Sequence, residues 1–270
     1  MKKFSFIVFI IFLLFSSFTL SAVITTINPY YLLVKQLLGS GEIVSLLLPP
    51  DLNPHVFSLK PSDAKKLEEA KLIVANGLGL EPYLEDYKEK TVFVADLVPR
   101  HTLVDENPHV WLSPILLKDY IVPSLSKVLM DKFPHLSGEI ERNAKKLIEG
   151  LNDFTVKARE TLSTYKGVKV IVVHPSFIYF FRDFGLEMVS LMEEGHEAQV
   201  SFSRIREILG SSKDIRAIFR EPQMPQQVVE PLERELKKKS YVLDPLGIDG
   251  EKSLLELLEK NLKVVLEALR

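Results

Sequence analysis

The sequence predicts an α/β protein of two lobes, each built on a parallel sheet, joined by one long helix. Strand-like and helix-like segments alternate in both halves of the chain, as is typical of parallel α/β sheets. The stretch between them, residues 137–165, contains no proline and repeats apolar residues at a helical spacing. A helix of this length is more than one small lobe needs, so we interpret it as the connection between two lobes.

In the first half, four strands and four helices are expected to alternate. The strands are Val23–Ile27, Ile43–Leu48, Leu72–Ala75 and Thr91–Ala95, and the helices are Tyr30–Leu38, Pro61–Ala70, Glu81–Tyr87 and Pro114 to about Lys132. Gly39 closes the first helix. Pro49 and Pro50 end the second strand, because proline cannot donate to a sheet ladder.

The connecting helix is expected from Ser137 to about Tyr165. Ser137 is a suitable N-cap, and the apolar positions behind it include Ile140, Leu147 and Leu151. Roughly 29 residues at 1.5 Å each would span about 43 Å. The alternative is two shorter helices separated by a bend near Gly150.

The second half resumes the alternation. Strands are expected at Val168–Val173, Glu187–Leu191, Ile215–Phe219 and Tyr241–Leu243, with helices at Ser176–Phe184, Phe202–Leu209, Gln226–Lys238 and Glu251–Leu269. The predicted organisation is thus a signal peptide at 1–22, an N-terminal lobe at 23–136, the long helix at 137–165 and a C-terminal lobe at 166–270.

The N-terminus has the pattern of a secretory signal peptide. Lys2 and Lys3 precede an apolar stretch from Phe4 to about Phe15, and small residues end at Ala22. The apolar stretch is shorter than the about 20 residues of a membrane span. An uncleaved anchor is the alternative. We therefore predict an exported protein that begins at Val23.

Composition limits the compartment and the partners. Cysteine is absent, so an exported chain of about 248 residues must be stabilised by its core rather than by disulfides. Without an N-terminal cysteine for lipid attachment, a periplasmic location is predicted. Removing Lys2 and Lys3 shifts the formal net charge of −2 to −4, which argues against a nucleic-acid partner. A monomer is expected.

Two copies of one tripeptide carry the first candidate ligands. Asn53-Pro54-His55 and Asn107-Pro108-His109 each follow an apolar, strand-like run. Proline fixes φ and restricts the residue before it, so the backbone is stiff where each imidazole is presented.

Two further candidates end strands of the second half. His174 follows the run 168–173, and Asp244 follows 241–243. A lone strand-end histidine is more often a hydrogen-bonded structural residue. Three such histidines and a carboxylate, however, match the ligand set of a four-coordinate metal site, and ligands of α/β sheets gather at the carboxyl ends of strands. The pattern therefore indicates metal capture rather than catalysis.

Several segments closely resemble the metal-binding receptors of zinc and manganese ABC importers. They are Asn53–Phe57 with Lys60–Asp63, Val74–Glu81, Asn107–Pro114, Val173-His174 with Tyr179 and Phe184–Leu186, Phe219–Gln223, and Leu243–Gly247. The resemblance covers essentially the whole mature chain in the same order. It implies the cluster A-I solute-binding fold, in which a rigid long helix joins two α/β lobes and the metal lies in the cleft.

The resemblance also implies a ligand set and a partner. The ligands would be His55 and His109 from the N-terminal lobe, and His174 and Asp244 from the C-terminal lobe. The partner would be a membrane ABC permease, and the protein would not be an enzyme. Manganese receptors of this family commonly have a glutamate at the third position, so His174 favours zinc, with manganese as the alternative. Affinity is expected to fall below about pH 6.5 as imidazole protonates.

The remaining polar candidates are expected to be peripheral. Many zinc receptors of this family have a long histidine-rich loop before the second ligand, whereas residues 97–107 contain only His101, Asp105 and Glu106. His101 is therefore expected on the surface, with an accessory ligand as the alternative. The surface is also expected for His135 and for His196, the latter among Glu193, Glu194 and Glu197.

For each of two acidic residues, Glu81 and Glu221, the sequence is compatible with two roles. Glu81 either complements a helix dipole or supports a ligand from behind. Glu221, at a strand end, either orients a ligand imidazole or only makes structural hydrogen bonds.

Other functions remain as rival hypotheses. A secreted zinc hydrolase would need a general base, and no His-Glu-x-x-His helix is present. A receptor of the same architecture for a chelated metal or another small molecule would not need inward-pointing histidines. An adhesin-like role, in contact with a host or neighbouring cell, is a further hypothesis that is compatible with metal binding.

Overall fold

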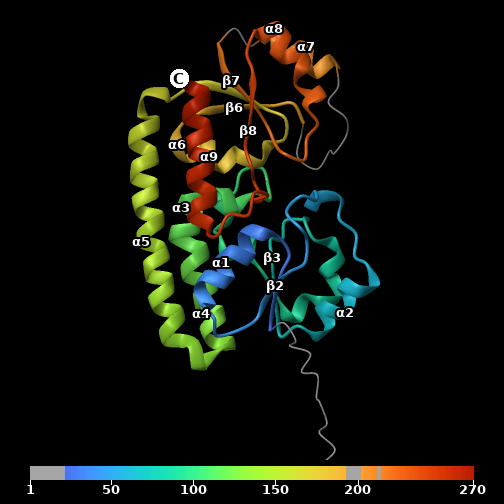
Figure 1. Cartoon of the computed structure of the whole chain (residues 1–270), viewed down its shortest axis with the longest axis vertical. Helices are drawn as coiled ribbons and strands as arrows, with labels where there is room; N and C mark the ends of the chain where they lie inside the picture. Colours follow the sequence, from blue (N-terminus) through green and yellow to red (C-terminus); the bar gives the residue numbers. More distant parts are fainter. Residues whose placement is uncertain (1–21, 193–201, 212–213) are drawn as a thin grey trace, which may run out of the picture.

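The computed structural model describes residues 22–192, 202–211 and 214–270. Residues 1–21 of the predicted signal peptide and His196 lie outside these ranges. Two four-stranded sheets, one in each half of the chain, form the centres of two lobes stacked one above the other in Figure 1.

The first sheet has the order β2-β1-β3-β4 and all its strand pairs are parallel. Its strands are β1 (Val23–Thr25), β2 (Val44–Leu46), β3 (Leu72–Ala75) and β4 (Thr91–Phe93). The central strands β1 and β3 are entirely buried and apolar for most of their length, as expected for a parallel sheet covered on both faces. All four strands were expected, and β3 has the predicted bounds.

The second sheet repeats this topology with the order β6-β5-β7-β8, again parallel throughout. Its strands are β5 (Lys169–Val172), β6 (Glu187–Ser190), β7 (Ile215–Arg220) and β8 (Ser240–Val242). In each sheet the second strand of the chain lies on one side of the first strand, and the third strand lies on the other side. The strand order therefore reverses beside the first strand, which gives each lobe a topological switch point at the carboxyl edge of its sheet.

The helices of the first half are α1 (Asn28–Leu38), α2 (Pro61–Glu69), α3 (Pro114–Leu116) and α4 (Val122–Lys132). Gly39 ends α1 with φ 60°. Two details differ from expectation. Residues Pro82–Lys90 form 3-10 turns rather than an α-helix, and the expected helix from Pro114 contains a π-turn at Leu117–Ile121. Pro123 lacks the amide needed for the next α-type bond, which accounts for the wider turn before it.

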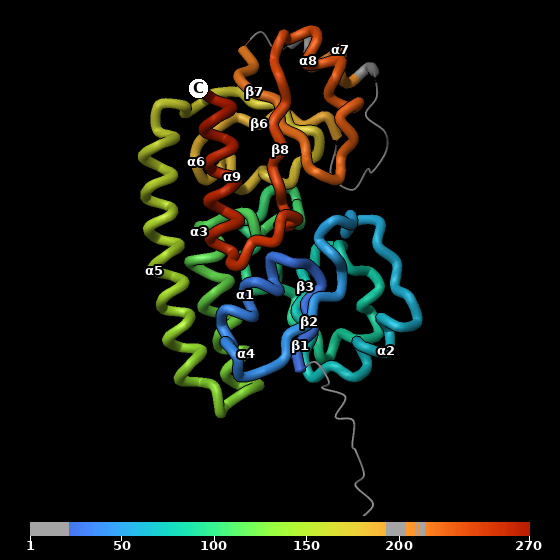
Figure 2. The backbone as a smooth tube through the Cα atoms, viewed as in Figure 1, coloured from blue at the N-terminus to red at the C-terminus, as the bar shows by residue number. Residues whose placement is uncertain are grey.

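The long helix α5 runs from Ser137 to Leu162, 26 residues, and a 3-10 turn at Ser163–Tyr165 follows it. It passes along both lobes in Figures 1 and 2. The helix continues through Gly150, where a Cβ would lie 2.6 Å from Leu255 Cδ1 of α9 (Leu254–Leu269). The glycine therefore allows two helices to approach closely and does not mark a bend.

The remaining helices are α6 (Ile178–Phe184), α7 (Phe202–Ser211) and α8 (Glu230–Leu236). The largest apolar cluster extends from Ala22 through the buried face of α5 to Leu269, so one core spans both lobes. Among the described helices, none combines the length and apolar character needed to cross a membrane.

Candidate metal centre

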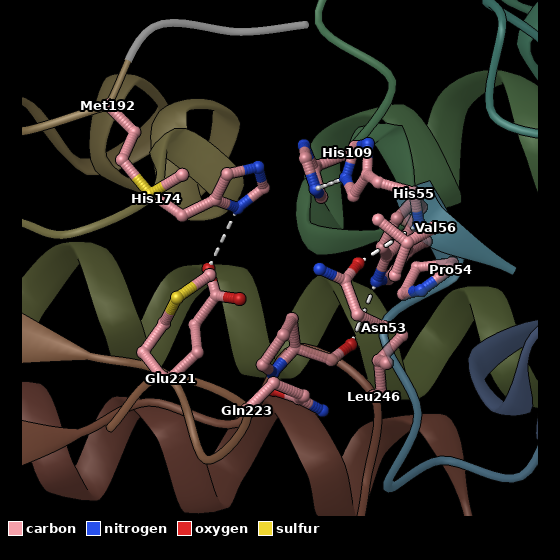
Figure 3. Close-up of a pocket in the computed structure, with 13 residues that line it drawn as sticks. Asn53, Pro54, His55, Val56, His109, His174, Met192, Glu221, Gln223 and Leu246 are labelled. Atoms are coloured by element: carbon pink, nitrogen blue, oxygen red, sulfur yellow. Dashed lines mark hydrogen bonds and ion pairs between the residues drawn. The ribbon is translucent and has the colours of Figure 1, made fainter. Parts of the chain in front are cut away.

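Three of the four predicted ligands meet between the lobes. His55 lies in the 3-10 turn Pro54–Val56 beyond β2, and His109 immediately precedes the turn Val110–Leu112. His174 follows β5 in the other lobe. Figure 3 shows the three imidazoles turned toward one another across a cavity of about 250 Å³.

The distances between the rings suit a shared ion. One ring nitrogen from each histidine lies within 4.8 Å of the others, and the Nε2 atoms of His55 and His109 are 3.3 Å apart. Ring centroids are separated by 4.8 to 5.3 Å. Imidazole nitrogens bind zinc at about 2.0–2.1 Å, so small adjustments of the side chains would place three nitrogens around one ion.

The repeated tripeptide makes the same turn twice. The side-chain oxygen of Asn53 accepts from the backbone N–H of His55 at 3.0 Å, and Asn107 does the same for His109 at 3.0 Å. In each case the asparagine oxygen pairs with the backbone N–H of the histidine two residues later, and the proline between them has no N–H that would need a partner. The sequence pattern therefore encodes a stiff turn that presents a histidine.

Two of the imidazoles are oriented through their Nδ1 atoms. Nδ1 of His109 lies 2.9 Å from the side-chain oxygen of Asn107, and Nδ1 of His174 lies 3.1 Å from the carboxylate of Glu221. Ser176 also donates to this carboxylate. With its Nδ1 proton donated to an oxygen, an imidazole keeps the lone pair of Nε2 for a metal. Glu221 thus contacts a predicted ligand, in agreement with the orienting role.

Burial keeps two of these imidazoles neutral. It lowers the pKa of His55 to about 4, with a further lowering by His174 and an opposing effect of Glu221. Burial also holds the pKa of His109 well below its usual range, assisted by the two neighbouring histidines. A metal binds the neutral form of imidazole, so neither ligand needs to lose a proton at neutral pH.

Acidification is expected to destabilise the metal-free protein through His55. Between its unfolded pKa near 6.5 and its folded pKa of about 4, the unfolded chain binds a proton that the folded protein does not. The free energy of unfolding therefore falls as pH decreases through this window, by on the order of 3 kcal/mol for this group. Urea unfolding from pH 7 to pH 4 would measure it. His55→Gln should show a fall smaller by this amount, and parallel curves would contradict the assignment.

The structure does not bring the fourth predicted ligand, Asp244, to the imidazoles. Its carboxylate accepts from the backbone N–H groups of Leu246, Gly247 and Ile248 at 3.0, 2.8 and 2.7 Å. The ammonium of Lys260 lies 3.7 Å away. Asp244 is at the predicted strand end, but its oxygens are held by its own turn, so its role as a ligand remains a prediction.

The turn after Asp244 contacts the N-terminal lobe beside the metal centre. Trp111 donates from Nε1 to the carbonyl oxygen of Pro245 at 2.9 Å, and its ring lies 5.0 Å from that of His109. Asn28 donates to the carbonyl oxygens of Leu246 and Gly247 at 2.8 and 3.2 Å. The carboxylate of Asp244 therefore shapes a turn that joins the two lobes.

The other candidates lie apart from the three imidazoles. His101 and His135 are exposed, and His135 lies 3.5 Å from Glu42. Glu81 accepts from the backbone N–H groups of Asn76 and Gly77 and from the Thr26 hydroxyl, so it organises a buried loop. Burial raises its pKa.

Sequence reasoning missed four participants. Asn107 holds the ring of His109, Gln223 donates to the carbonyl oxygen of Pro50 at 3.0 Å across the cleft, and Met192 and Met224 line the cavity. The repeated tripeptide was a signal for the asparagine. The methionines gave none, because an isolated methionine is usually a core residue.

Two repeated α/β lobes, a long helix along both, and three imidazoles between them are the features of a two-lobed receptor with a candidate metal centre between its lobes. A sequence profile of the family described as zinc-uptake complex component A, periplasmic, matches residues 23–268. The chain belongs to this family. It is a metal-binding, substrate-binding protein of the ABC-transporter type and not an enzyme.

Individual relatives agree with this assignment. The chain is 57% identical over 248 residues to a Thermotoga maritima protein provisionally named as metal-binding, covering 92% of each. It is 23% identical over 258 residues to the manganese-binding lipoprotein MntA of Bacillus subtilis, covering 86% of this chain and 84% of the relative. A crystal structure of ZnuA superimposes with a TM-score of 0.80 at 26% identity, covering 92% and 98% of the two chains.

Proposed function

We propose that this protein is an extracytoplasmic zinc receptor that delivers the ion to a membrane ABC permease. The observation that carries the proposal is the meeting of His55, His109 and His174 from two lobes in one cavity. Because the ligands come from both lobes, a bound ion would hold the lobes in one arrangement, which a permease can recognise.

Zinc is preferred to manganese because of the donor atoms. Three neutral imidazole nitrogens form a set that suits zinc, whereas manganese favours carboxylate and other oxygen ligands. The two carboxylates considered as oxygen ligands, Glu221 and Asp244, have other partners. Glu221 accepts from His174 and Ser176, and Asp244 accepts from three backbone amides. The fourth coordination position would then be filled by water or by Asp244 after its turn rearranges.

Manganese is the second candidate ion, because a relative is named for manganese binding and because Glu221 lines the cavity. The name of the Bacillus subtilis relative assigns it manganese binding. Glu221 lines the cavity beside His174, and a rotation of its side chain would add an oxygen ligand. Such a site would have one carboxylate and three imidazoles.

A competitive titration tests the choice. The chelator-stripped chain from Val23 to Arg270 is titrated with zinc and with manganese against an indicator chelator. One tightly bound zinc per chain, with manganese at least tenfold weaker, is the expected result. Preferential binding of manganese would transfer the function to that ion, and no tight binding of either would refute a metal receptor.

Asp244→Asn is expected to lower stability more than zinc affinity. The amide cannot replace all the bonds of a carboxylate that accepts from three backbone amides, so the free energy of unfolding should fall by about 1–3 kcal/mol. Zinc affinity should change less than about tenfold, since His55, His109 and His174 remain. Thermal unfolding and the same titration measure the two effects.

Asp249→Asn is the matched control, because Asp249 also contacts Lys260, at 2.5 Å, but its side chain is 71% exposed. It should change neither quantity substantially. A hundredfold loss of zinc affinity in Asp244→Asn alone would instead establish Asp244 as the fourth ligand.

A further inference from the structure

The segment that carries His109 is bonded to helix α6 of the opposite lobe. The hydroxyl of Tyr179 donates to the carbonyl oxygen of Asn107 at 2.6 Å and accepts from the backbone N–H of Val104 at 3.3 Å. One turn further along α6, Arg182 donates to the carbonyl oxygen of Thr102 at 2.5 Å. These contacts tie both ends of the loop before the second ligand to the C-terminal lobe.

Asn107 is the point at which these contacts reach the metal centre. Its side-chain nitrogen donates to the carbonyl oxygen of Pro175, in the C-terminal lobe, at 3.2 Å. This bond fixes which way the amide faces, so the side-chain oxygen must face His109, where it lies 3.0 Å from the backbone nitrogen and 2.9 Å from Nδ1. Nδ1 of His109 is therefore the protonated nitrogen, and Nε2 faces the other rings.

Tyr179 is built into a rigid environment. Its side chain is fully buried, Asn107 is 2% exposed, and the guanidinium of Arg182 lies over the tyrosine ring, 5.0 Å from its centroid. A buried aromatic ring has few alternative rotamers, so its hydroxyl is held at one point. A bond to this hydroxyl transmits the position of α6 to the loop of His109.

The first tripeptide provides a contrast. Asn53 binds the backbone N–H of His55 in the same way, yet the described residues give it no bond to the ring of His55. The neighbouring Val56 is 61% exposed, and a bond from Gln223 to the carbonyl oxygen of Pro50 joins this loop to the opposite lobe. The two copies of the motif thus differ in how the second lobe supports them.

We propose that Tyr179 is a positioning residue of the metal centre, which fixes the second ligand, His109, from the opposite lobe through Asn107. The inference rests on the proposed metal-binding function. It means that His109 and His174 are both held by the C-terminal lobe although His109 precedes the long helix in sequence. The two lobes share a ligand, and the metal centre is formed only when α6 and the loop of His109 are in contact.

Tyr179→Phe tests the proposal, because it removes the hydroxyl and keeps the ring. We expect the dissociation constant for zinc to rise by roughly 10- to 100-fold, the usual effect of losing a residue that orients a metal ligand. The absorption bands of bound cobalt(II) should also shift, since they report the geometry around the ion. Thr155→Val is the matched control: Thr155 donates from a buried hydroxyl to the carbonyl oxygen of Leu151 at 2.7 Å, on α5. It should lose thermal stability without a change in zinc affinity or in the cobalt spectrum.

The outcomes separate the two hypotheses. Wild-type affinity and an unchanged cobalt spectrum in Tyr179→Phe would overturn the positioning role while leaving the receptor function intact. If the wild-type chain itself fails to bind zinc or manganese tightly, the receptor function fails instead. Should Tyr179→Phe not fold, Asn107→Ala tests the step from Asn107 to the ligand, because it keeps the backbone oxygen that Tyr179 contacts but removes the side-chain oxygen that holds His109. A cobalt spectrum unchanged in that variant would equally overturn the proposal.

Discussion

Replacing His55 with alanine is expected to weaken zinc binding by about 10²- to 10³-fold. Zinc held by three or four protein ligands is bound with about 10–16 kcal/mol, so each ligand contributes roughly 3–4 kcal/mol, and every 1.4 kcal/mol is a factor of ten. His109→Ala and His174→Ala should lose as much or more, because Asn107 and Glu221 orient these rings. Competition against an indicator chelator measures the three dissociation constants.

His101→Ala is the control for this series, because His101 is exposed in the 3-10 turn Arg100–Thr102 and lies outside the cluster of three imidazoles. Its zinc affinity should equal that of the wild type. If any one of the three alanine variants kept wild-type affinity, that histidine would not be a ligand. A loss in His101→Ala would show that the loop before the second ligand also binds metal.

Trp111→Ala is expected to reduce the free energy of unfolding by about 3–5 kcal/mol, the usual cost of removing a large buried aromatic side chain. Trp111 is 1% exposed, contacts the rings of Tyr30 and His109, and donates to the carbonyl oxygen of Pro245 in the other lobe. Urea unfolding of the metal-free protein measures the loss. Circular dichroism must follow it, because the chain has only one tryptophan and the variant has none.

Trp111→Phe separates packing from hydrogen bonding at this position. It keeps most of the aromatic volume but leaves the carbonyl oxygen of Pro245 without its donor, so a smaller loss of about 1–3 kcal/mol is expected. A loss below about 1 kcal/mol in Trp111→Ala would show that the surrounding residues collapse into the space. The aromatic ring would then not be needed to hold the two lobes together.

The sequence predicted most of the fold because its signals are local. Prolines and glycines mark where segments end, and apolar runs mark the buried strands, as at Leu72–Ala75. The spacing of apolar residues also predicted that 137–165 is one helix. The spacing left the role of Gly150 open, since a glycine within a helix is compatible both with a bend and with the close approach of another helix. The position of Leu255, more than a hundred residues later, decided this.

The residues of the candidate site could also be predicted from local signals, but the direction of one side chain could not. A histidine that follows a strand or a stiff asparagine-proline turn is placed at a sheet edge by its own neighbours, so His55, His109 and His174 could be named. Asp244 was also placed correctly at a strand end. The direction of its carboxylate, however, depends on competition between a metal and three backbone amides of the following turn. The geometry of that turn cannot be predicted from the spacing of residues in the sequence.

The amino-acid sequence by itself determined the two-lobed α/β architecture, the long connecting helix and the identity of three imidazoles, because short-range periodicity and backbone stiffness fix these features. Only the tertiary structure decided how the imidazoles are held. Two identical tripeptides receive different support, since Pro175 and Tyr179 of the opposite lobe contact Asn107, whereas Asn53, among the residues that the structure describes, bonds within its own turn alone. Contacts between residues some seventy positions apart depend on how the lobes pack, and no local pattern specifies them.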